Sequence, residues 1–235
     1  MIFQLLLNFL SLYKSRSLLS IKYQYLKFFL FYLFNIKKIN ATNKKYENIL
    51  CSKKKITEKW FTKNIFFFNK ILNDFFIKKI SILEIGCYEG YSALYWIKYF
   101  PAAKLTCVDT FKGSEEQPST KNFFLVEKNF DFNLKLQKRL KKIKSLSSDF
   151  FKKIKDFYNI IYIDGSHKAK DVYIDAINAD KFLTKDGYLI FDDYFWKLYK
   201  NKQDPIYGIN KFLEKHKKKY QIIYVNQLIF LKKII

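Results

Sequence analysis

Cysteine and histidine are scarce in this sequence of 235 residues, which carries three of the first and two of the second. The cysteines are Cys51, Cys87 and Cys107, an odd number with no close pair and no metal-type spacing. This scarcity excludes a disulfide scaffold and a histidine-rich metal centre, and His216, in a lysine-rich stretch, is expected at the surface. A reducing compartment fits, so we expect the cytoplasm or the interior of an organelle.

Arginine is almost absent, since Arg16 and Arg139 are the only two among 44 basic residues. The formal net charge of +23 alone would suggest nucleic acid or an anionic membrane as a partner. Recognition of bases and phosphates, however, relies on the bidentate guanidinium group, which lysine lacks. The abundance of Lys, Asn, Ile, Phe and Tyr is typical of A/T-rich codons. We interpret the charge first as codon composition, which makes nucleic acid a disfavoured partner.

Long uncharged runs are also missing, because a membrane-spanning helix needs about 20 nearly uncharged residues. Residues 1–10 and 26–34 are apolar, but Lys14, Lys22 and other basic residues interrupt this N-terminal stretch. No small-residue cleavage site of a signal peptide stands out. We predict a helical, lysine- and aromatic-rich extension over residues 1–75 that packs on the core. A basic interfacial helix or a targeting segment is the alternative.

Beyond residue 75, short β-rich runs alternate with longer amphipathic segments, which favours a parallel sheet with crossover helices. The predicted strands are 80–85, 104–108, 143–146, 159–163 and 188–191. The predicted helices are 91–100, 123–140, 149–155, 169–183 and 209–219. Two further strands, 220–225 and 228–232, flank Asn226-Gln227 and predict a terminal antiparallel hairpin. We therefore predict an α/β domain over residues 76–235, with a mostly parallel sheet of seven strands.

Glycine is rare as well, and four of the six glycines lie at the start or the end of a predicted strand. Gly86 and Gly90 fall in the segment Ile82-Leu83-Glu84-Ile85-Gly86-Cys87-Tyr88-Glu89-Gly90, where a strand leads through a turn into a helix. Such a turn lets the backbone approach a ligand closely, and the helix N-terminus offers N–H groups. Asp109 ends the next strand, where an acid can accept hydrogen bonds from both hydroxyls of a ribose.

This order of strand, glycine turn, helix and acid resembles the class I methyltransferases that use S-adenosylmethionine. Their first motif is usually written E/D-x-G-x-G-x-G, and here it is Glu84-x-Gly86-x-x-x-Gly90, with Tyr88 in place of the middle glycine. The G-x-G-x-x-G turn of dinucleotide dehydrogenases is absent. The resemblance covers residues 60–235 and implies a Rossmann-like, doubly wound sheet whose terminal hairpin holds the reversed seventh strand.

The resemblance also implies which residues hold S-adenosylmethionine. Glu84 is expected to contact the methionine end, Gly86 to let the cofactor lie against the turn, and Asp109 to hold the ribose. An ordinary capping or loop carboxylate is the alternative for both acids. Ser147 and Asp149 follow the third predicted strand, where an adenine-binding acid is expected, although the usual Asp-Ser order is not reproduced. The cofactor-binding candidates are therefore Glu84, Gly86, Gly90, Asp109, Ser147 and Asp149.

A second group of candidates follows the fourth and fifth predicted strands. Asp164 and His167 stand in Asp164-Gly165-Ser166-His167, and Asp192 and Asp193 end the next strand. Because ligands of open α/β sheets bind at the carboxyl ends of strands, we expect these acids at the same edge as the cofactor loop. Carboxylates at close quarters repel one another unless a cation joins them, and oxygen ligands select a hard cation such as Mg²⁺. The predicted metal ligands are Asp164, Asp192 and Asp193.

These acids resemble those of the metal-dependent O-methyltransferases, both the catechol-type and the antibiotic-sugar enzymes. In that group a carboxylate follows strand four, an acidic pair follows strand five, and a catalytic base stands three residues beyond the first carboxylate. His167 stands three residues beyond Asp164. The resemblance implies that these two residues are catalytic, with His167 as the base. A histidine that only holds its loop, and an Asp193 that only caps the next segment, are the alternatives.

The sequence thus predicts a Mg²⁺-assisted O-methyltransferase that acts on a small hydroxylated molecule or a sugar. An RNA methyltransferase, a hydroxylase-like relative and a non-catalytic, methyltransferase-like binding protein are the alternatives. No N/D-P-P-Y/F motif occurs, which disfavours methylation of exocyclic base amines. Tyr194 and Trp196 follow the acidic pair and are expected to touch the substrate. Peripheral membrane contact by the N-terminus stays open, and neither the acceptor nor the oligomeric state follows from the sequence.

Overall fold

The computed structural model describes three stretches of the chain, residues 2–15, 17–113 and 122–235. They form two compact units: residues 36–153, and the residues up to 35 together with 154–235. The long helix α2 (Leu19–Cys51) contributes to both units. The boundaries of these units lie after residues 35 and 153, whereas the sequence predicted a domain boundary after residue 75. The predicted boundary stays a prediction.

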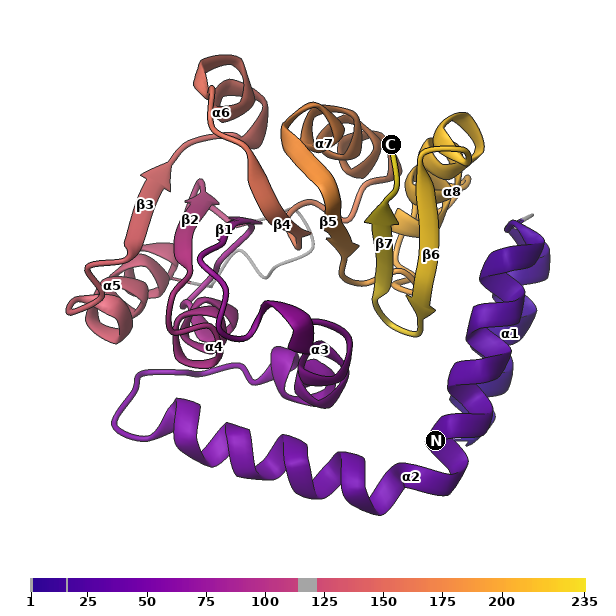
Figure 1. Cartoon of the computed structure of the whole chain (residues 1–235), viewed down its shortest axis with the longest axis horizontal. Helices are drawn as coiled ribbons and strands as arrows, with labels where there is room; N and C mark the ends of the chain where they lie inside the picture. The colour runs from indigo at the N-terminus through magenta and orange to yellow at the C-terminus, as the bar shows by residue number, and fades with distance from the viewer. Residues whose placement is uncertain (1, 16, 114–121) are drawn as a thin grey trace. The chain divides into compact units, whose positions relative to one another are not determined.

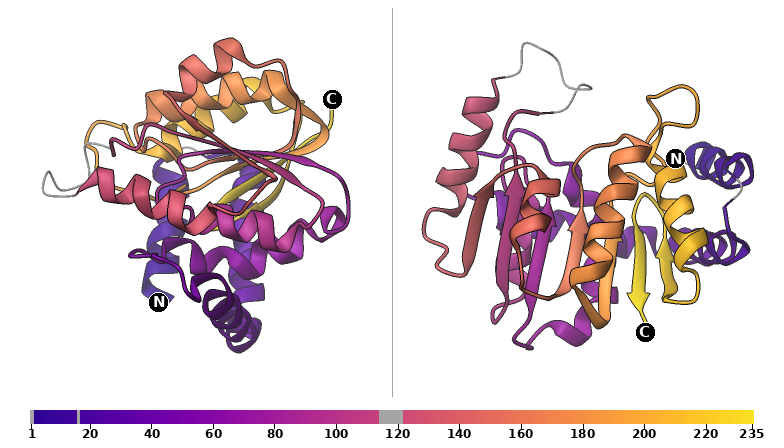
Figure 2. Two further views of the ribbon diagram at one scale, coloured as in Figure 1. Left: turned by 90° about the vertical axis from the view of Figure 1, so that its left-hand side faces the viewer. Right: turned by 90° about the horizontal axis from the view of Figure 1, so that it is seen from above.

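The unit of residues 36–153 contains three parallel strands (Figure 1). They are β1 (Ser81–Ile85), β2 (Lys104–Asp109) and β3 (Leu140–Lys144), with β2 between the other two. The helices are η1 (Trp60–Asn64), α3 (Ile65–Ile71), η2 (Asn73–Phe75), α4 (Tyr91–Tyr99), α5 (Phe123–Leu134) and α6 (Ser147–Lys153). Figure 2 shows α4 and α5 on one face of these strands and α6 on the other.

The predicted boundaries near β3 need correction. We predicted a helix as far as residue 140 and a strand from residue 143, but α5 ends at Leu134 and β3 begins at Leu140. The reason is the sheet register, since Leu140 pairs with Leu105 of β2. The chain must therefore leave the helix early enough to enter the sheet beside β2.

An aromatic cluster fixes the position of α4 in this unit. The ring centroids of Phe61 and Phe68 lie 5.0 Å apart, and those of Phe68 and Trp96 lie 5.1 Å apart. Tyr95 and Phe100 belong to the same cluster, and all five rings are buried. Large buried rings supply much of the apolar area that stabilises a domain. The cluster therefore holds the helix that follows the glycine turn.

Arg139, one of the two arginines, has a structural role in the same unit. Its guanidinium group donates hydrogen bonds to the carbonyl oxygens of Ile97, Phe100 and Ala103, at 2.8, 3.0 and 2.8 Å. These carbonyls belong to the last turn of α4 and the residues after it, which lack intrahelical partners. The arginine is thus committed to capping a helix.

The other unit contains four strands, of which only β4 (Tyr158–Ile163) and β5 (Leu183–Phe191) pair in parallel. The strand β7 (Ile229–Lys233) pairs antiparallel with β5 and with β6 (Tyr220–Val225). The helices here are α1 (Ile2–Lys14), α7 (Ala169–Phe182), α8 (Pro205–His216) and the first part of α2. The predicted terminal hairpin is confirmed.

The hydrogen-bonded order of the seven strands is β3-β2-β1-β4-β5-β7-β6. The pairs β1–β2, β2–β3 and β4–β5 are parallel, and the two pairs that contain β7 are antiparallel. A helix lies in each connection between successive parallel strands. The predicted fold class, a Rossmann-like, doubly wound and mostly parallel sheet of seven strands with a terminal hairpin, is confirmed. In such a sheet, ligands bind outside the carboxyl ends of the strands.

Candidate active site

The turn after β1 has three left-handed residues at alternate positions. Gly86, Tyr88 and Gly90 adopt φ angles of 85°, 47° and 81°. Glycine adopts this region freely, whereas a residue with a side chain is strained there. Tyr88 thus holds the backbone conformation expected of the middle glycine that this motif lacks. The replacement changes the side chain but preserves the path of the turn.

Asp109, the last residue of β2, is bonded directly to that turn. Its Oδ2 accepts hydrogen bonds from the backbone N–H groups of Cys87, at 2.7 Å, and Tyr88, at 2.9 Å. Its Oδ1 accepts a third from the N–H of Phe111, at 2.7 Å. Carboxylates that accept backbone N–H groups form the stronger class of hydrogen bond. The structure therefore brings the acid and the glycine turn into contact, while the role of Asp109 toward a ribose stays a prediction.

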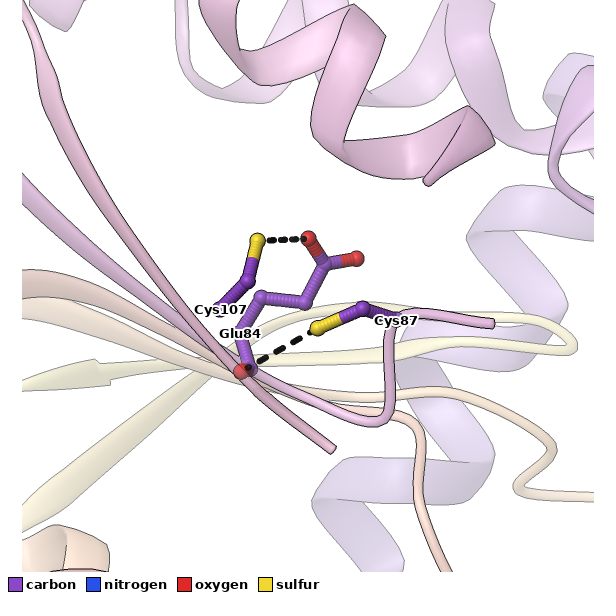
Figure 3. A group of neighbouring side chains, drawn as sticks. All are labelled: Glu84, Cys87 and Cys107. Atoms are coloured by element: carbon purple, nitrogen blue, oxygen red, sulfur yellow. Dashed lines mark hydrogen bonds between the residues drawn. The ribbon is translucent and has the colours of Figure 1, made fainter. Parts of the chain in front are cut away.

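Glu84 lies fully buried behind the turn, among two thiols (Figure 3). The Ser92 hydroxyl donates a hydrogen bond to Oε1, and the Cys107 thiol donates one to Oε2 at 3.5 Å. The Cys87 thiol points instead to the Glu84 carbonyl oxygen, 3.7 Å away. Burial raises the pKa of Glu84 to about 8, so this carboxyl group is mostly protonated in the free protein at neutral pH.

The two buried thiols lie close enough to Glu84 to share a cation, because ligand atoms of the three residues all lie within 4.8 Å of one another. Burial raises the pKa of the Cys107 thiol to about 12 and that of the Cys87 thiol well above its usual value. The thiolate is the form that binds metal or reacts. We therefore interpret these cysteines as protonated packing groups beneath the turn.

Replacing Glu84 by glutamine is expected to remove a pH dependence of stability. Because the folded-state pKa is raised, the protonated carboxyl contributes stability at low pH that is lost as the pH rises through about 8. Between about pH 6 and pH 8, the free energy of unfolding of the wild type should fall by about 2 kcal/mol relative to Glu84→Gln. Urea denaturation of both proteins at several pH values measures this difference. Parallel pH curves for the two proteins would contradict the assigned burial.

Glu89, inside the glycine turn, belongs to a network that the sequence did not reveal. Its Oε2 accepts from the backbone N–H of Thr57 at 2.6 Å and from the Thr57 hydroxyl at 3.0 Å. Its Oε1 accepts from the Asn129 amide at 2.7 Å, and its carbonyl oxygen accepts from Asn133 at 2.9 Å. The buried acid thus ties residue 57 and helix α5 to the turn. In the sequence, the only indication of this network was the presence of an acidic residue between Tyr88 and Gly90.

Trp60 packs beside the turn as well. Its ring centroid lies 5.1 Å from that of Tyr88, and about half of the Trp60 side chain is exposed. Thr62, in the same 3-10 helix, shares a hydrogen bond of 2.7 Å with the Tyr91 hydroxyl at the start of α4. The segment around residues 57–62 therefore covers the turn with aromatic and hydroxyl side chains.

Ser147 and Asp149 lie in the first turn of α6, which follows β3. The backbone N–H of Ser145 bonds to the carbonyl oxygen of Asp109 at 3.0 Å, so the ends of β2 and β3 lie side by side. Asp149 forms an exposed ion pair of 2.9 Å with Lys152, which lowers the pKa of Asp149. The proposed adenine-binding role of the two residues stays a prediction.

The second group of acids lies at the carboxyl ends of β4 and β5 in the other unit. Tyr162, in β4, directs its hydroxyl to Oδ2 of both Asp164 and Asp192. The backbone N–H of Asp192 bonds to the carbonyl oxygen of Ile163 at 3.0 Å, which joins the two strand ends. The predicted gathering of acids after these strands is therefore present.

His167 lies among these acids. Its Nε2 is 3.0 Å from Oδ2 of Asp193, and both side chains are about one-fifth exposed. The histidine ring also packs on Trp196, with centroids 5.1 Å apart. Ligand atoms of Asp164, His167 and Asp193 lie within 4.8 Å of one another, a grouping that could hold a metal ion. Asp193 has a left-handed φ of 52°, a conformation that costs energy and is frequent at functional sites.

This grouping differs from the predicted metal set, which contains Asp192 instead of His167. The Asp192 carboxylate faces the Tyr162 hydroxyl and accepts, through Oδ1, the backbone N–H of Asp193 at 2.7 Å. The sequence after β5 does not show whether Asp192 or Asp193 faces His167. Asp192 therefore keeps its place in the set only as a prediction.

The expectation that both Tyr194 and Trp196 touch substrate needs a correction. Tyr194 is fully buried, and its hydroxyl bonds to Asn210 at 2.7 Å and to Ser17 at 3.1 Å. A side chain in that position supports the core and offers no surface. Trp196 is 39% exposed beside His167 and stays a candidate for substrate contact.

Comparison with known proteins agrees with this arrangement. The methyltransferase domain family matches residues 83–194, a range that begins in β1 and ends just after the acidic pair. No curated protein matches the chain in sequence. The family match covers 112 of the 235 residues, and together with the fold it agrees with the prediction of a class I methyltransferase domain.

Several solved methyltransferase structures share the fold. MycE, from the mycinamycin biosynthetic pathway, was solved with Mg and S-adenosylhomocysteine and aligns with a TM-score of 0.57 at 16% identity, over 82% of this chain and 54% of MycE. An O-methyltransferase from Bacillus cereus, solved with S-adenosylhomocysteine, gives 0.56 at 14% identity, over 85% and 90%. A candidate rRNA methylase from Clostridium thermocellum gives 0.54 at 15%, over 76% and 100%. The chain thus spans about half of the length of MycE, and these identities show the fold alone.

Proposed function

We propose that the chain transfers the methyl group of S-adenosylmethionine to a hydroxyl group of a small molecule or a sugar, with Mg²⁺ bound by its acidic cluster. The observation that carries the proposal is the grouping of Asp164, His167 and Asp193 after β4 and β5. MycE, which has a similar fold, was also solved with Mg and mycinamycin VI, which supports a small-molecule acceptor.

The cofactor would be held by the turn after β1 and by the tips of β2 and β3. Asp109 keeps the turn in place through Oδ2, and its Oδ1 is the oxygen offered to a ribose. Glu84, protonated in the free protein, favours a cationic methionine group nearby because such a group stabilises the carboxylate form. Gly90 cannot be replaced freely, since a Cβ there would lie 2.6 Å from a methyl group of Leu134. Ser147 and Asp149 are the proposed adenine contacts.

The donor atoms of the acidic cluster fit a hard divalent cation. Asp164 and Asp193 offer carboxylate oxygens, the ligands that Mg²⁺ prefers, and His167 lies beside them. Asp192 adds a further carboxylate at the end of β5. Held by these carboxylates, Mg²⁺ would supply a Lewis acid that eases deprotonation of the acceptor hydroxyl.

His167 is the proposed base for the acceptor hydroxyl. One oxygen of Asp193 orients the imidazole through Nε2, and the face of Trp196 limits the rotation of the ring. A neutral imidazole can accept the proton of a hydroxyl group as a general base. Because the sulfonium methyl group is already activated, the remaining task of the protein is to align donor and acceptor.

Calorimetry followed by an activity screen tests this proposal. S-adenosylmethionine should bind with or without Mg²⁺, and transfer of a labelled methyl group to hydroxylated metabolites should require a divalent cation. Transfer that is unaffected by a chelator would remove the metal from the proposal and leave the methyltransferase assignment in place. Methylation of RNA, with an affinity that falls steeply as salt rises, would favour the RNA methyltransferase instead.

A further inference from the structure

Helix α1 buries polar residues and exposes several of its leucines, although Leu12 is buried. Asn8 and Ser11, and Ser15 just after the helix, are buried, with exposed fractions of 2%, 6% and 7%. Leu6 and Leu10, in contrast, are 52% and 55% exposed. A surface helix of a water-soluble protein normally shows the opposite arrangement. The prediction that the N-terminal extension simply packs on the core therefore leaves the outward face of this helix unexplained.

Hydrogen bonds fix this inverted orientation. The Lys197 ammonium group donates to the Ser11 hydroxyl at 2.6 Å. Ser17, which follows α1, receives a hydrogen bond of 2.9 Å from the Asn210 amide, and its hydroxyl bonds to Ser15 at 2.8 Å. Rotating the helix to bury its leucines would break these bonds and leave buried polar groups without partners, which costs free energy. The apolar side of α1 is thus held outward.

The first part of α2 continues the same pattern. Its exposed apolar residues recur at intervals of three or four, which places them on one face: Leu19, Tyr23, Leu26, Leu30 and Leu33. The buried face of the same helix carries Ile21, Tyr25 and Phe28. The Tyr25 hydroxyl donates a hydrogen bond of 3.0 Å to the carbonyl oxygen of Leu5, so α1 and the start of α2 lie side by side (Figure 1).

The charge around these helices has one sign. Residues 1–46 contain eight lysines and arginines and no aspartate or glutamate. Lys22 and Lys27 lie over the exposed rings of Tyr13 and Tyr23, at 4.1 and 4.5 Å from the ring centroids. Lysine beside outward apolar side chains suits an interface where hydrocarbon meets anionic headgroups, because the ammonium group reaches the headgroups while the stem stays in the apolar layer.

We propose that the outward leucine face of α1 and α2 binds the surface of an anionic lipid bilayer, with both helices lying in its plane. This face consists of the exposed side chains of Leu6, Leu10, Leu19, Tyr23, Leu26, Leu30 and Leu33. A second copy of the chain is a poorer occupant, since two such surfaces would bring lysines together with no acidic residue of the segment to pair them. Among the described residues, no helix is both long and apolar enough to cross a bilayer, so binding would be peripheral.

Vesicle sedimentation tests the proposal with a matched pair of variants. Leu30 in α2 and Leu125 in α5 are both helical leucines with 49% of their surface exposed, and glutamate adds the same charge at either position. Wild type and Leu125→Glu should bind vesicles that contain phosphatidylglycerol and should bind pure phosphatidylcholine weakly. Leu30→Glu should bind the anionic vesicles at least about tenfold more weakly, because an apolar contact is lost and a charge must enter the interface.

Three results would overturn the proposal. The wild type could fail to sediment with anionic vesicles, or Leu30→Glu could bind as well as Leu125→Glu, which would reduce the interaction to the general charge of the chain. The wild type could also be a dimer that Leu30→Glu dissociates in analytical ultracentrifugation, which would assign the face to a second copy. Circular dichroism of both variants ensures that the comparison is made between folded proteins.

Discussion

Replacing Asp109 by alanine is expected to weaken S-adenosylmethionine binding by at least about a hundredfold, a loss of about 3 kcal/mol. The carboxylate accepts hydrogen bonds from Cys87, Tyr88 and Phe111, and its removal leaves these N–H groups without that partner. The same change removes the acid proposed to hold the ribose. Equilibrium dialysis with labelled cofactor measures the dissociation constant.

The control for this substitution is Asp131→Asn, since Asp131 is an exposed acid of the same unit that pairs only with Lys142 in the described contacts. It should bind the cofactor as the wild type does. A second variant, Asp109→Asn, separates the two roles, because the amide keeps one acceptor oxygen but turns an N–H₂ group toward the remaining donor. Wild-type affinity in Asp109→Ala would show that the turn holds no cofactor.

Replacing Asp164 by asparagine or His167 by alanine is expected to lower turnover by about a thousandfold and to leave the affinity for S-adenosylmethionine unchanged. The proposed roles of both residues concern the acceptor hydroxyl, so the loss should appear in kcat with the hydroxylated acceptor. A labelled-methyl assay measures the turnover, and equilibrium dialysis with labelled cofactor measures the affinity.

Asp156→Asn is the matched control, because Asp156 is an exposed acid just before β4 in the same unit. Its turnover should equal that of the wild type. If Asp164→Asn and His167→Ala keep full turnover, the acidic cluster is structural and another group removes the proton. If no variant and no wild-type preparation transfers a methyl group to any acceptor, the non-catalytic alternative gains support.

The sequence predicted the glycine turn well because the physical requirement is local. Left-handed backbone at Gly86 and Gly90 favours glycine, and a chain with only six glycines places them where the backbone demands them. The position of Asp109 at the end of β2 was predicted from the order of strand, glycine turn, helix and strand. Tyr88 shows the limit of this argument, because its left-handed φ of 47° is held by surroundings that no local pattern reveals.

Contacts between residues distant in sequence were beyond such patterns. The network around Glu89 joins Thr57 to Asn129 and Asn133 of α5, which lie far from Thr57 along the chain. Tyr194 was expected at the substrate because it follows two acids, yet its partner Ser17 comes from the N-terminal segment and draws it into the core. Residues that are adjacent in sequence after a strand can therefore lie in different surroundings, as the acids at the site and the buried Tyr194 do.

The N-terminal helices show a related limit. A run of leucines and phenylalanines predicts an element that buries its apolar residues, and hydropathy alone does not tell on which side they lie. Only the positions of Asn8 and Ser11, buried against hydrogen-bond partners in the same unit, reveal that the leucines face outward. Polar residues within an apolar stretch were the signal, and the partners of Ser11 and Ser17, Lys197 and Asn210, lie nearly 200 residues away in the chain.

Hydrogen–deuterium exchange with and without S-adenosylmethionine most directly tests whether the turn after β1 and the tip of β2 form a cofactor site. Bound cofactor should slow exchange at the backbone amides of residues 84–90 and 109–111 and leave the peptides of α1 unchanged. Protection confined to other segments, or none at saturating cofactor, would contradict the assignment on which the proposed function depends.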